Sequence, residues 1–144
     1  ERLPSDDVQC GDVEVHAAPI KTKGRMRDKV KCYAREHPHA DVVLPLTAYI
    51  LDPVRTSVVC SGPEAILEYV DWLIQHGPRC GLPVVRVKNK FASQDSSEYD
   101  GYRDLMVCVL YTGEKGLRII GEIQFHDARM YRLKVKMHKL YKVK

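Results

Sequence analysis

The chain has 144 residues, of which 44% are hydrophobic and 29% are charged, a balance typical of one soluble globular domain with its own core. No run of residues approaches the roughly 18 consecutive apolar positions that a membrane-spanning helix needs. The net charge of +4 is unevenly distributed, because residues 129–144 alone contain seven lysines and arginines and no acidic residue. The composition therefore argues against a membrane protein and favours partners that carry negative charge.

The five cysteines lie at positions 10, 32, 60, 80 and 108, with neither an even count nor a Cys-x2-Cys spacing. Cys60 and Cys108 fall inside apolar runs, where a free thiol behaves as a small hydrophobic side chain. These features argue against a disulfide framework and against a zinc site. They predict a reducing compartment, that is, an intracellular and cytoplasmic protein.

Residues 1–19 are expected to form an N-terminal arm or an edge strand, with a short apolar alternation at Val13 and Val15. The chain starts without an initiator Met and without a signal-peptide pattern, which predicts a segment of a longer protein. A helix is predicted from Ile20 to Arg35, and it carries six basic residues at odd positions from Lys21 to Lys31. Its apolar positions recur at helical spacing: Met26, Val30, Tyr33 and Ala34.

A β-branched run predicts a buried strand over Val54–Cys60. A helix follows, with Ser61 as its N-cap and Glu64 three residues later, and it ends at Gly77. A second strand is predicted over Val84–Phe91. Its basic side chains alternate outward at Arg86, Lys88 and Lys90.

A loop is predicted at residues 92–100, and two further strands over Met106–Tyr111 and Leu117–Phe125, joined by a turn at 112–116. A last helix begins at about Asp127, where apolar residues recur at helical spacing. The predicted fold is a mixed α/β (α+β) domain, in which a sheet of about four or five strands is flanked by helices.

Three short polar motifs lie on these apolar runs in the last third of the chain. They are Gly101-Tyr102-Arg103-Asp104, then Glu122-x-Gln124, then Lys134 with His138, Tyr141 and Lys142. Side chains two apart on a strand share a face, so Glu122 and Gln124 point the same way. An acid and an amide that project together from an apolar strand predict a functional site.

The order of these motifs resembles that in the synthetase domain of RelA/SpoT-type (p)ppGpp synthetases. Arg86-x-Lys88 is similar to the basic strand that leads into the guanine-binding loop of that family. Asp52-x2-Arg55 resembles its Asp-plus-Arg strand, and the segment 25–29 resembles its basic ATP-side segment. The resemblance covers about residues 20–144 and implies one divergent domain with a nucleotidyltransferase-like fold.

The resemblance also implies a role for each matching residue. Asp52 would bind Mg²⁺, and Glu122 would assist the metal or accept the proton of an attacking ribose hydroxyl. Tyr102 would stack on guanine, while Arg86 and Lys88 would contact phosphate oxygens, which suit a guanidinium fork and an ammonium group. The other implied substrate-binding residues are Gln124, Arg25, Lys29, Arg55 and His138.

These residues also have structural interpretations. Asp52 can cap a turn before Pro53, Glu122 can pair with a nearby lysine, and Tyr102 can be a core residue at a strand end. His138 is equally well explained by a structural hydrogen bond.

Several positions depart from the pattern of active synthetases. Met106 stands where the family has a His, and Phe125-His126-Asp127 stands where it has Ile-Arg-Thr. Asp52 and Arg55 are closer together than the family pair, and the 25–29 segment lacks a Ser before its lysine. Each lost polar contact in a phosphoryl-transfer site can cost a few kcal/mol of transition-state binding. The departures predict a retained fold with impaired chemistry.

Three functions are therefore open. The first is a degenerate domain that binds a purine nucleotide (GDP, GTP or ATP) or serves as a structural part of a larger assembly with protein partners. The second is an active Mg²⁺-dependent pyrophosphokinase that transfers pyrophosphate from ATP to GDP or GTP. The third is a nucleic-acid-binding module that uses the basic tail and the segment 21–31, although no base-reading motif supports it.

Overall fold

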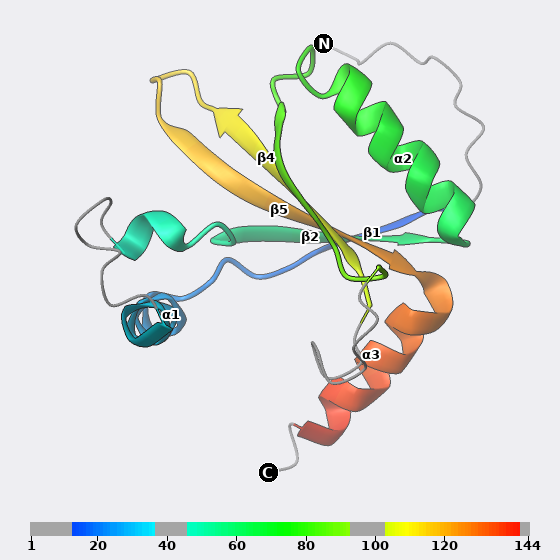
Figure 1. Ribbon diagram of the computed structural model, residues 1–144, viewed down its shortest axis with the longest axis horizontal. Coiled ribbons are helices and arrows are strands. Elements are labelled where there is room, and N and C mark those ends of the chain that lie inside the picture. Colours follow the sequence, from blue (N-terminus) through cyan, green and yellow to red (C-terminus); the bar gives the residue numbers. More distant parts are fainter. Residues whose placement is uncertain (1–12, 37–45, 93–102, 142–144) are drawn as a thin grey trace.

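A mixed five-stranded sheet with helices on both faces forms the described part of the chain (Figure 1). The computed structural model describes residues 13–36, 46–92 and 103–141. In chain order its elements are β1 (Glu14–Ala17), α1 (Lys23–Glu36), the 3-10 helix η2 (Leu46–Tyr49), β2 (Val54–Cys60), α2 (Pro63–His76), β3 (Val84–Asn89), β4 (Leu105–Thr112), β5 (Arg118–Asp127) and α3 (Ala128–Tyr141). This arrangement confirms the predicted α+β fold with one mixed sheet.

The strands lie in the order β1-β2-β5-β4-β3. The β2–β5 pair at the centre is parallel, while the β1–β2, β4–β5 and β3–β4 pairs are antiparallel. β1 and β3 are therefore the two edges. Glu14–Ala17 form an edge strand, whereas residues 1–12 of the predicted N-terminal arm lie outside the described residues.

One face of the sheet is apolar, and α2 covers it (Figure 1). Ile66, Val70 and Leu73 lie on one side of α2, because they recur at i, i+4 and i+7. They pack in one cluster with buried side chains of β2, β4 and β5, namely Cys60, Leu105, Val107, Val109 and Phe125. This cluster is the core that holds the sheet in place.

The other face of the sheet is polar, and α1 and α3 lie on this side (Figure 1). Strand pairing sets one row of neighbours across it: Arg55, Glu122, Cys108 and Arg86. The next row is Ser57, Gln124, Met106 and Lys88. Because side chains alternate along a strand, these positions face away from the apolar core.

The predicted N-cap of the second helix is wrong by one residue. Gly62, not Ser61, is the N-cap of α2, and no side chain caps this end. Pro63 explains the difference, since its fixed φ and missing N–H suit the first helical position and leave the cap to the residue before it. The other end is as predicted. A Cβ atom at Gly77 would collide with the backbone carbonyls of Leu73 and Leu82.

Several boundaries differ from the predicted ones by a few residues. The first helix starts at Lys23 rather than Ile20, β3 ends at Asn89 rather than Phe91, and β5 continues to Asp127. The predicted loop at 92–100 falls almost entirely outside the described residues. In the parts of the chain that the structure describes, no helix is both long enough and apolar enough to cross a membrane.

We expect the Ile66→Ala substitution to lower the free energy of unfolding by about 2–5 kcal/mol, because it leaves a cavity under the sheet. Ile66 is 3% exposed, whereas its neighbour Leu67 is 65% exposed on the same helix. Leu67→Ala is the matched control and should change stability by no more than about 0.5 kcal/mol. Urea denaturation measures both. Equal effects of the two substitutions would contradict this packing of α2.

Candidate functional site

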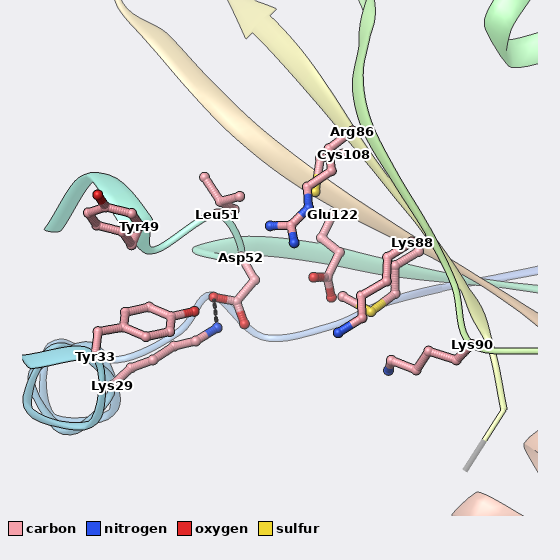
Figure 2. Close-up of a pocket in the computed structure, with 11 residues that line it drawn as sticks. Lys29, Tyr33, Tyr49, Leu51, Asp52, Arg86, Lys88, Lys90, Cys108 and Glu122 are labelled. Atoms are coloured by element: carbon pink, nitrogen blue, oxygen red, sulfur yellow. Dashed lines mark hydrogen bonds and ion pairs between the residues drawn. The ribbon is translucent and has the colours of Figure 1, made fainter. Parts of the chain in front are cut away.

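A cavity of about 320 Å³ opens on the polar face of the sheet (Figure 2). Its walls come from four parts of the fold: α1, the segment from η2 to β2, the edge strand β3, and the central strands β4 and β5. The lining residues are Lys29, Tyr33, Tyr49, Leu51, Asp52, Arg86, Lys88, Lys90, Met106, Cys108 and Glu122. Cationic side chains outnumber the two carboxylates among them, so the cavity suits an anionic ligand.

Local sequence explains how these side chains reach one cavity. Arg86 and Lys88 alternate with Val85 and Val87 on β3, so both basic side chains are on the polar face. The pairing of β4 with β5 then places Glu122 beside Cys108, whose other neighbour is Arg86.

Asp52 lies just before β2, and its carboxylate forms ion pairs with two lysines. Lys29 donates to Oδ1 at 2.8 Å, and Lys21 donates to Oδ2. Partial burial raises the pKa of Asp52, but the two lysines outweigh it and hold the pKa below its ordinary value. The same pairing outweighs burial at Lys29 and raises its pKa. Asp52 is therefore ionised and charge-compensated.

Glu122 is 5% exposed and is held by a chain of polar side chains from β5 and α3. Nε2 of Gln124 donates to Oε1 of Glu122 at 2.6 Å, and Nζ of Lys134 donates to Oε1 of Gln124 at 3.2 Å. Nζ of Lys134 also lies 3.4 Å from Nε2 of His126. The orientation of the Glu122 carboxylate thus depends on α3, through Lys134.

A second buried charge pair lies on the same side of the sheet. Nζ of Lys90 is 2.9 Å from Oδ1 of Asp104, and the Asp104 side chain is almost fully buried. The backbone N–H of Lys90 also donates to the Asp104 carbonyl at 3.0 Å. The negative charge of Asp104 therefore compensates the positive charge of Lys90, one of the basic residues that line the cavity.

A second cavity, of about 410 Å³, adjoins the first at Lys29 of α1. Its basic residues are Lys21, Arg25, Lys29 and Arg55, and Lys29 lines both cavities. The two cavities therefore meet at Lys29, one of the two lysines that pair with Asp52.

The structure brings most of the sequence-predicted residues together. Asp52, Glu122, Arg86, Lys88 and Lys29 line the first cavity, and Gln124 contacts Glu122 beside it. Arg25 and Arg55 line the second. Tyr102 lies outside the described residues, and His138 lies on α3 with a side chain that the structure does not describe. The roles of all these residues remain predictions.

Sequence reasoning assigned no site role to Lys90, Asp104 and His126, and it included Lys21 only as one of the basic residues 21–31 that could face phosphates. Lys21 is the first residue of the basic run 21–31 and lies just before α1, and Asp104 belongs to the Gly-Tyr-Arg-Asp motif, so each carried a signal in the sequence. Lys21 pairs with Asp52, and Asp104 pairs with Lys90. Only the fold brings the two residues of each pair together.

The predicted magnesium ligands must compete with lysines in this arrangement. Both oxygens of Asp52 accept from ammonium groups, and Oε1 of Glu122 accepts from Gln124. Within residues 13–36, 46–92 and 103–141, no group of three or more His, Cys, Asp or Glu side chains could hold a metal ion. As the side chains stand, Mg²⁺ could bind Asp52 only by displacing a lysine, although carboxylate oxygens and water are the ligands that Mg²⁺ prefers.

His126 provides a pH test of the buried network. Burial, with Lys134 and Lys90 nearby, lowers the pKa of this histidine from 6.5 to about 3. The unfolded chain takes up a proton as the pH falls below about 6.5 and the folded protein does not, so acid destabilises the fold. Between about pH 7 and about pH 5 we expect a loss of about 2 kcal/mol of unfolding free energy.

Urea denaturation across this pH range measures that loss. His126→Gln should remove most of it, while His76→Gln on α2, at the opposite face of the sheet, should keep the wild-type slope. An unchanged slope in His126→Gln would contradict a buried neutral histidine.

No protein-family model and no curated protein matches the sequence, but solved structures match the fold. Small alarmone synthetase 1 from Bacillus subtilis, bound to its product pppGpp, is 23% identical with a TM-score of 0.65. The same enzyme bound to AMPCPP is 20% identical with a TM-score of 0.60. A Streptococcus mutans UA159 protein is 20% identical with a TM-score of 0.62.

These matches extend over most of this chain but only part of the matched structures. They cover 89%, 90% and 89% of this chain, and 62%, 59% and 60% of the three solved chains, in that order. This chain thus spans about three fifths of the structures it matches. The predicted resemblance to RelA/SpoT-type synthetases is confirmed at the level of the fold, and the chain has the fold of the small alarmone synthetases.

Proposed function

We propose that this chain is a degenerate RelA/SpoT-like domain that binds a purine nucleotide without transferring pyrophosphate. The main support is the pair of adjoining basic cavities that share Lys29. They lie on a fold that also occurs in an enzyme solved with pppGpp and with AMPCPP. Both of those ligands are purine nucleotides with several phosphate groups, and such groups suit cation-lined cavities.

The first cavity offers both kinds of contact that a nucleotide needs. Arg86 and Lys88 supply cationic donors for phosphate oxygens. Tyr33 and Tyr49 supply two aromatic rings on the opposite wall, with centroids 6.2 Å apart and planes tilted by 60°. A purine base can stack on an aromatic ring with a gain of about 1–3 kcal/mol. Tyr102 would add the stacking partner that the family resemblance implies.

The loss of chemistry is inferred from the side chains that replace the polar residues of the family. Met106 lines the cavity beside Gln124, at the position where the resemblance implies a histidine. A thioether can neither carry a proton nor donate a strong hydrogen bond. The cavity therefore lacks one polar group for transition-state stabilisation.

Phe125-His126-Asp127 stand where the family has Ile-Arg-Thr, and this difference removes further polar groups from the cavity. Phe125 is part of the apolar core, and Asp127 accepts from the backbone N–H of Arg129 at the start of α3. His126 is buried and neutral, so it does not replace the charge of the arginine. The three residues serve packing, capping and the buried network, and none adds a cation to the cavity.

An active Mg²⁺-dependent pyrophosphokinase is the alternative, and one observation favours it. Asp52 and Glu122 line the same cavity although 70 residues separate them in the sequence. In that case Asp52 and Glu122 would hold the metal. The metal ion would neutralise part of the phosphate charge. Lys21 or Lys29 would first have to move away from Asp52 to make room for it.

A degenerate domain could also serve only as a structural part of a larger assembly, without binding a nucleotide. A cytoplasmic location is proposed from the cysteine count and spacing in the sequence. Nucleic-acid binding through the basic residues 129–144 would appear as a nucleotide-independent, strongly salt-sensitive affinity for RNA or DNA.

Replacing Arg86 and Lys88 with Ala should weaken binding of GDP, GTP or ATP by about 1.5–3 kcal/mol for each charged hydrogen bond lost. Stability should hardly change, because Arg86 is exposed and Lys88 is half-buried. The control is the double variant Lys115→Ala and Arg118→Ala, which removes the same charge from exposed positions at the β4–β5 turn. Isothermal titration calorimetry measures both. Equal losses would indicate a general charge effect rather than this cavity.

The domain should form no (p)ppGpp above background when incubated with labelled ATP, Mg²⁺ and GDP or GTP, because its cavity lacks the polar groups named above. Small alarmone synthetase 1 from Bacillus subtilis, assayed in parallel, provides the positive control. Product formation by the wild type that Glu122→Gln abolishes would establish the active alternative instead. No nucleotide binding at all would leave the structural role.

A further inference from the structure

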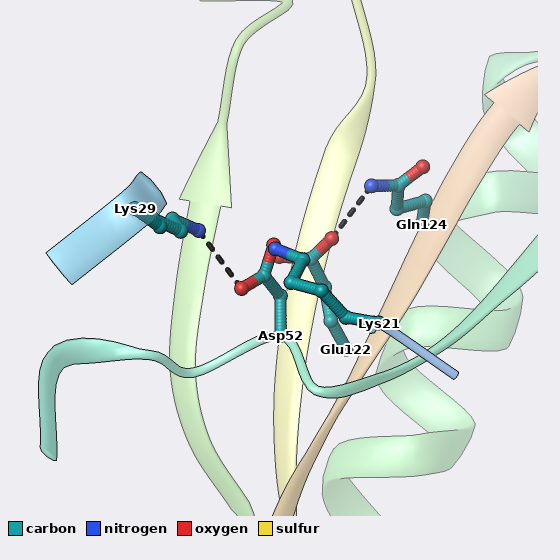
Figure 3. A network of polar contacts seen from close by, with 5 residues as sticks. All are labelled: Lys21, Lys29, Asp52, Glu122 and Gln124. Atoms are coloured by element: carbon teal, nitrogen blue, oxygen red, sulfur yellow. Dashed lines mark hydrogen bonds and ion pairs between the residues drawn. The ribbon is translucent and has the colours of Figure 1, made fainter. Parts of the chain in front are cut away.

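Each oxygen of the Asp52 carboxylate already accepts from a lysine of the same chain, and Figure 3 shows these side chains together. Lys29 lies 2.8 Å from Oδ1, and Lys21 contacts Oδ2. The Asp52 side chain is 11% exposed, and those of Lys21 and Lys29 are 12% and 32% exposed. The three charges are therefore largely shielded from water. An ion pair in such a shielded position is stronger than one at an open surface.

The position of Lys21 is fixed by the backbone as well as by its side chain. Its N–H donates to the carbonyl of Pro53 at 3.0 Å, next to Asp52 in sequence. Three residues earlier, the N–H of Ala18 donates to the carbonyl of Arg55 at 3.1 Å. The segment between β1 and α1 thus runs beside the start of β2 and delivers the lysine to Asp52.

The local charge balance also disfavours a divalent cation. Lys90 pairs with Asp104 and can be left out of the count. The remaining cations at the first cavity and Asp52 are Lys21, Lys29, Arg86 and Lys88, and the carboxylates are Asp52 and Glu122. Four positive charges against two negative ones give a surplus of two. A Mg²⁺ ion would have to lose water and enter this positive field.

We propose that Lys21 and Lys29 take the place of a divalent cation at Asp52, so that the cavity binds the purine nucleotide as its metal-free anion. This inference rests on the proposed function and specifies the ionic form of its ligand. The two ammonium groups neutralise Asp52 and leave a net positive wall for the phosphates. Mg²⁺ then weakens binding, because it complexes the free nucleotide and competes with the lysines for the same oxygens.

Titration calorimetry of the whole chain with GDP and with ATP tests the proposal, once in excess EDTA and once in millimolar MgCl₂. We expect binding in EDTA to be tighter by about tenfold, which corresponds to about 1.4 kcal/mol. Tighter binding in MgCl₂ would overturn the proposal.

A double variant sharpens the test. Lys21→Met with Lys29→Met keeps long side chains but releases Asp52, so nucleotide binding should weaken in EDTA and improve on addition of Mg²⁺. The control is Lys23→Met with Lys31→Met, which removes two exposed charges from α1, the helix that also carries Lys29. In the control, the sign of the Mg²⁺ effect should remain that of the wild type.

A titration with Mn²⁺ alone, followed by electron paramagnetic resonance, separates this proposal from the proposed function because it needs no nucleotide. The wild type should bind no Mn²⁺ at this site. The double variant, or Lys29→Met alone if the double variant does not fold, should bind it. Wild-type Mn²⁺ binding that Asp52→Asn abolishes would refute the proposal that Lys21 and Lys29 replace the metal ion. This result would hold even if the protein bound no nucleotide.

Discussion

The parallel pairing of β2 with β5 sets Arg55 opposite Glu122 and Ser57 opposite Gln124, and the rest of the site depends on this register. Side chains alternate along each strand, so a slip by one residue would turn Glu122 toward α2 and Ile123 toward the cavity. The apolar contacts of Phe125 with the core under α2 prevent such a slip. The burial that stabilises one face thus determines which polar groups gather on the other.

The polar face then combines two kinds of charge compensation. Asp52 and Asp104 each pair with lysines, whereas Glu122 accepts from an amide. Breaking a buried pair by removing one partner costs more than the pair itself contributes, because it leaves a charge without compensation. This asymmetry gives the charged residues of the polar face a structural role in addition to any role in ligand binding.

The sequence predicted the parts of the structure that local patterns determine. The β-branched run 54–60 and the alternating basic residues of β3 identified strands, and the Glu122-x-Gln124 spacing identified a shared face. The N-cap of α2 was missed because Pro63 outweighed the hydroxyl of Ser61. The contact of Lys21 with Asp52 could not be predicted, since 31 residues separate them and no local pattern links them. The neutrality of His126 depends on burial under α3, which composition does not reveal.

The junction between β5 and α3 has no linker, since the strand ends at Asp127 and the helix begins at Ala128. Oδ1 of Asp127 accepts from the backbone N–H groups of Arg129 and Met130, which fastens the first turn of the helix to the strand. Further along, Lys134 reaches back to Gln124 and His126. The helix is therefore attached to β5 at two points, at its start through Asp127 and further along through Lys134. The placement of α3 and the orientation of the Glu122 carboxylate thus belong to one connected set of hydrogen bonds.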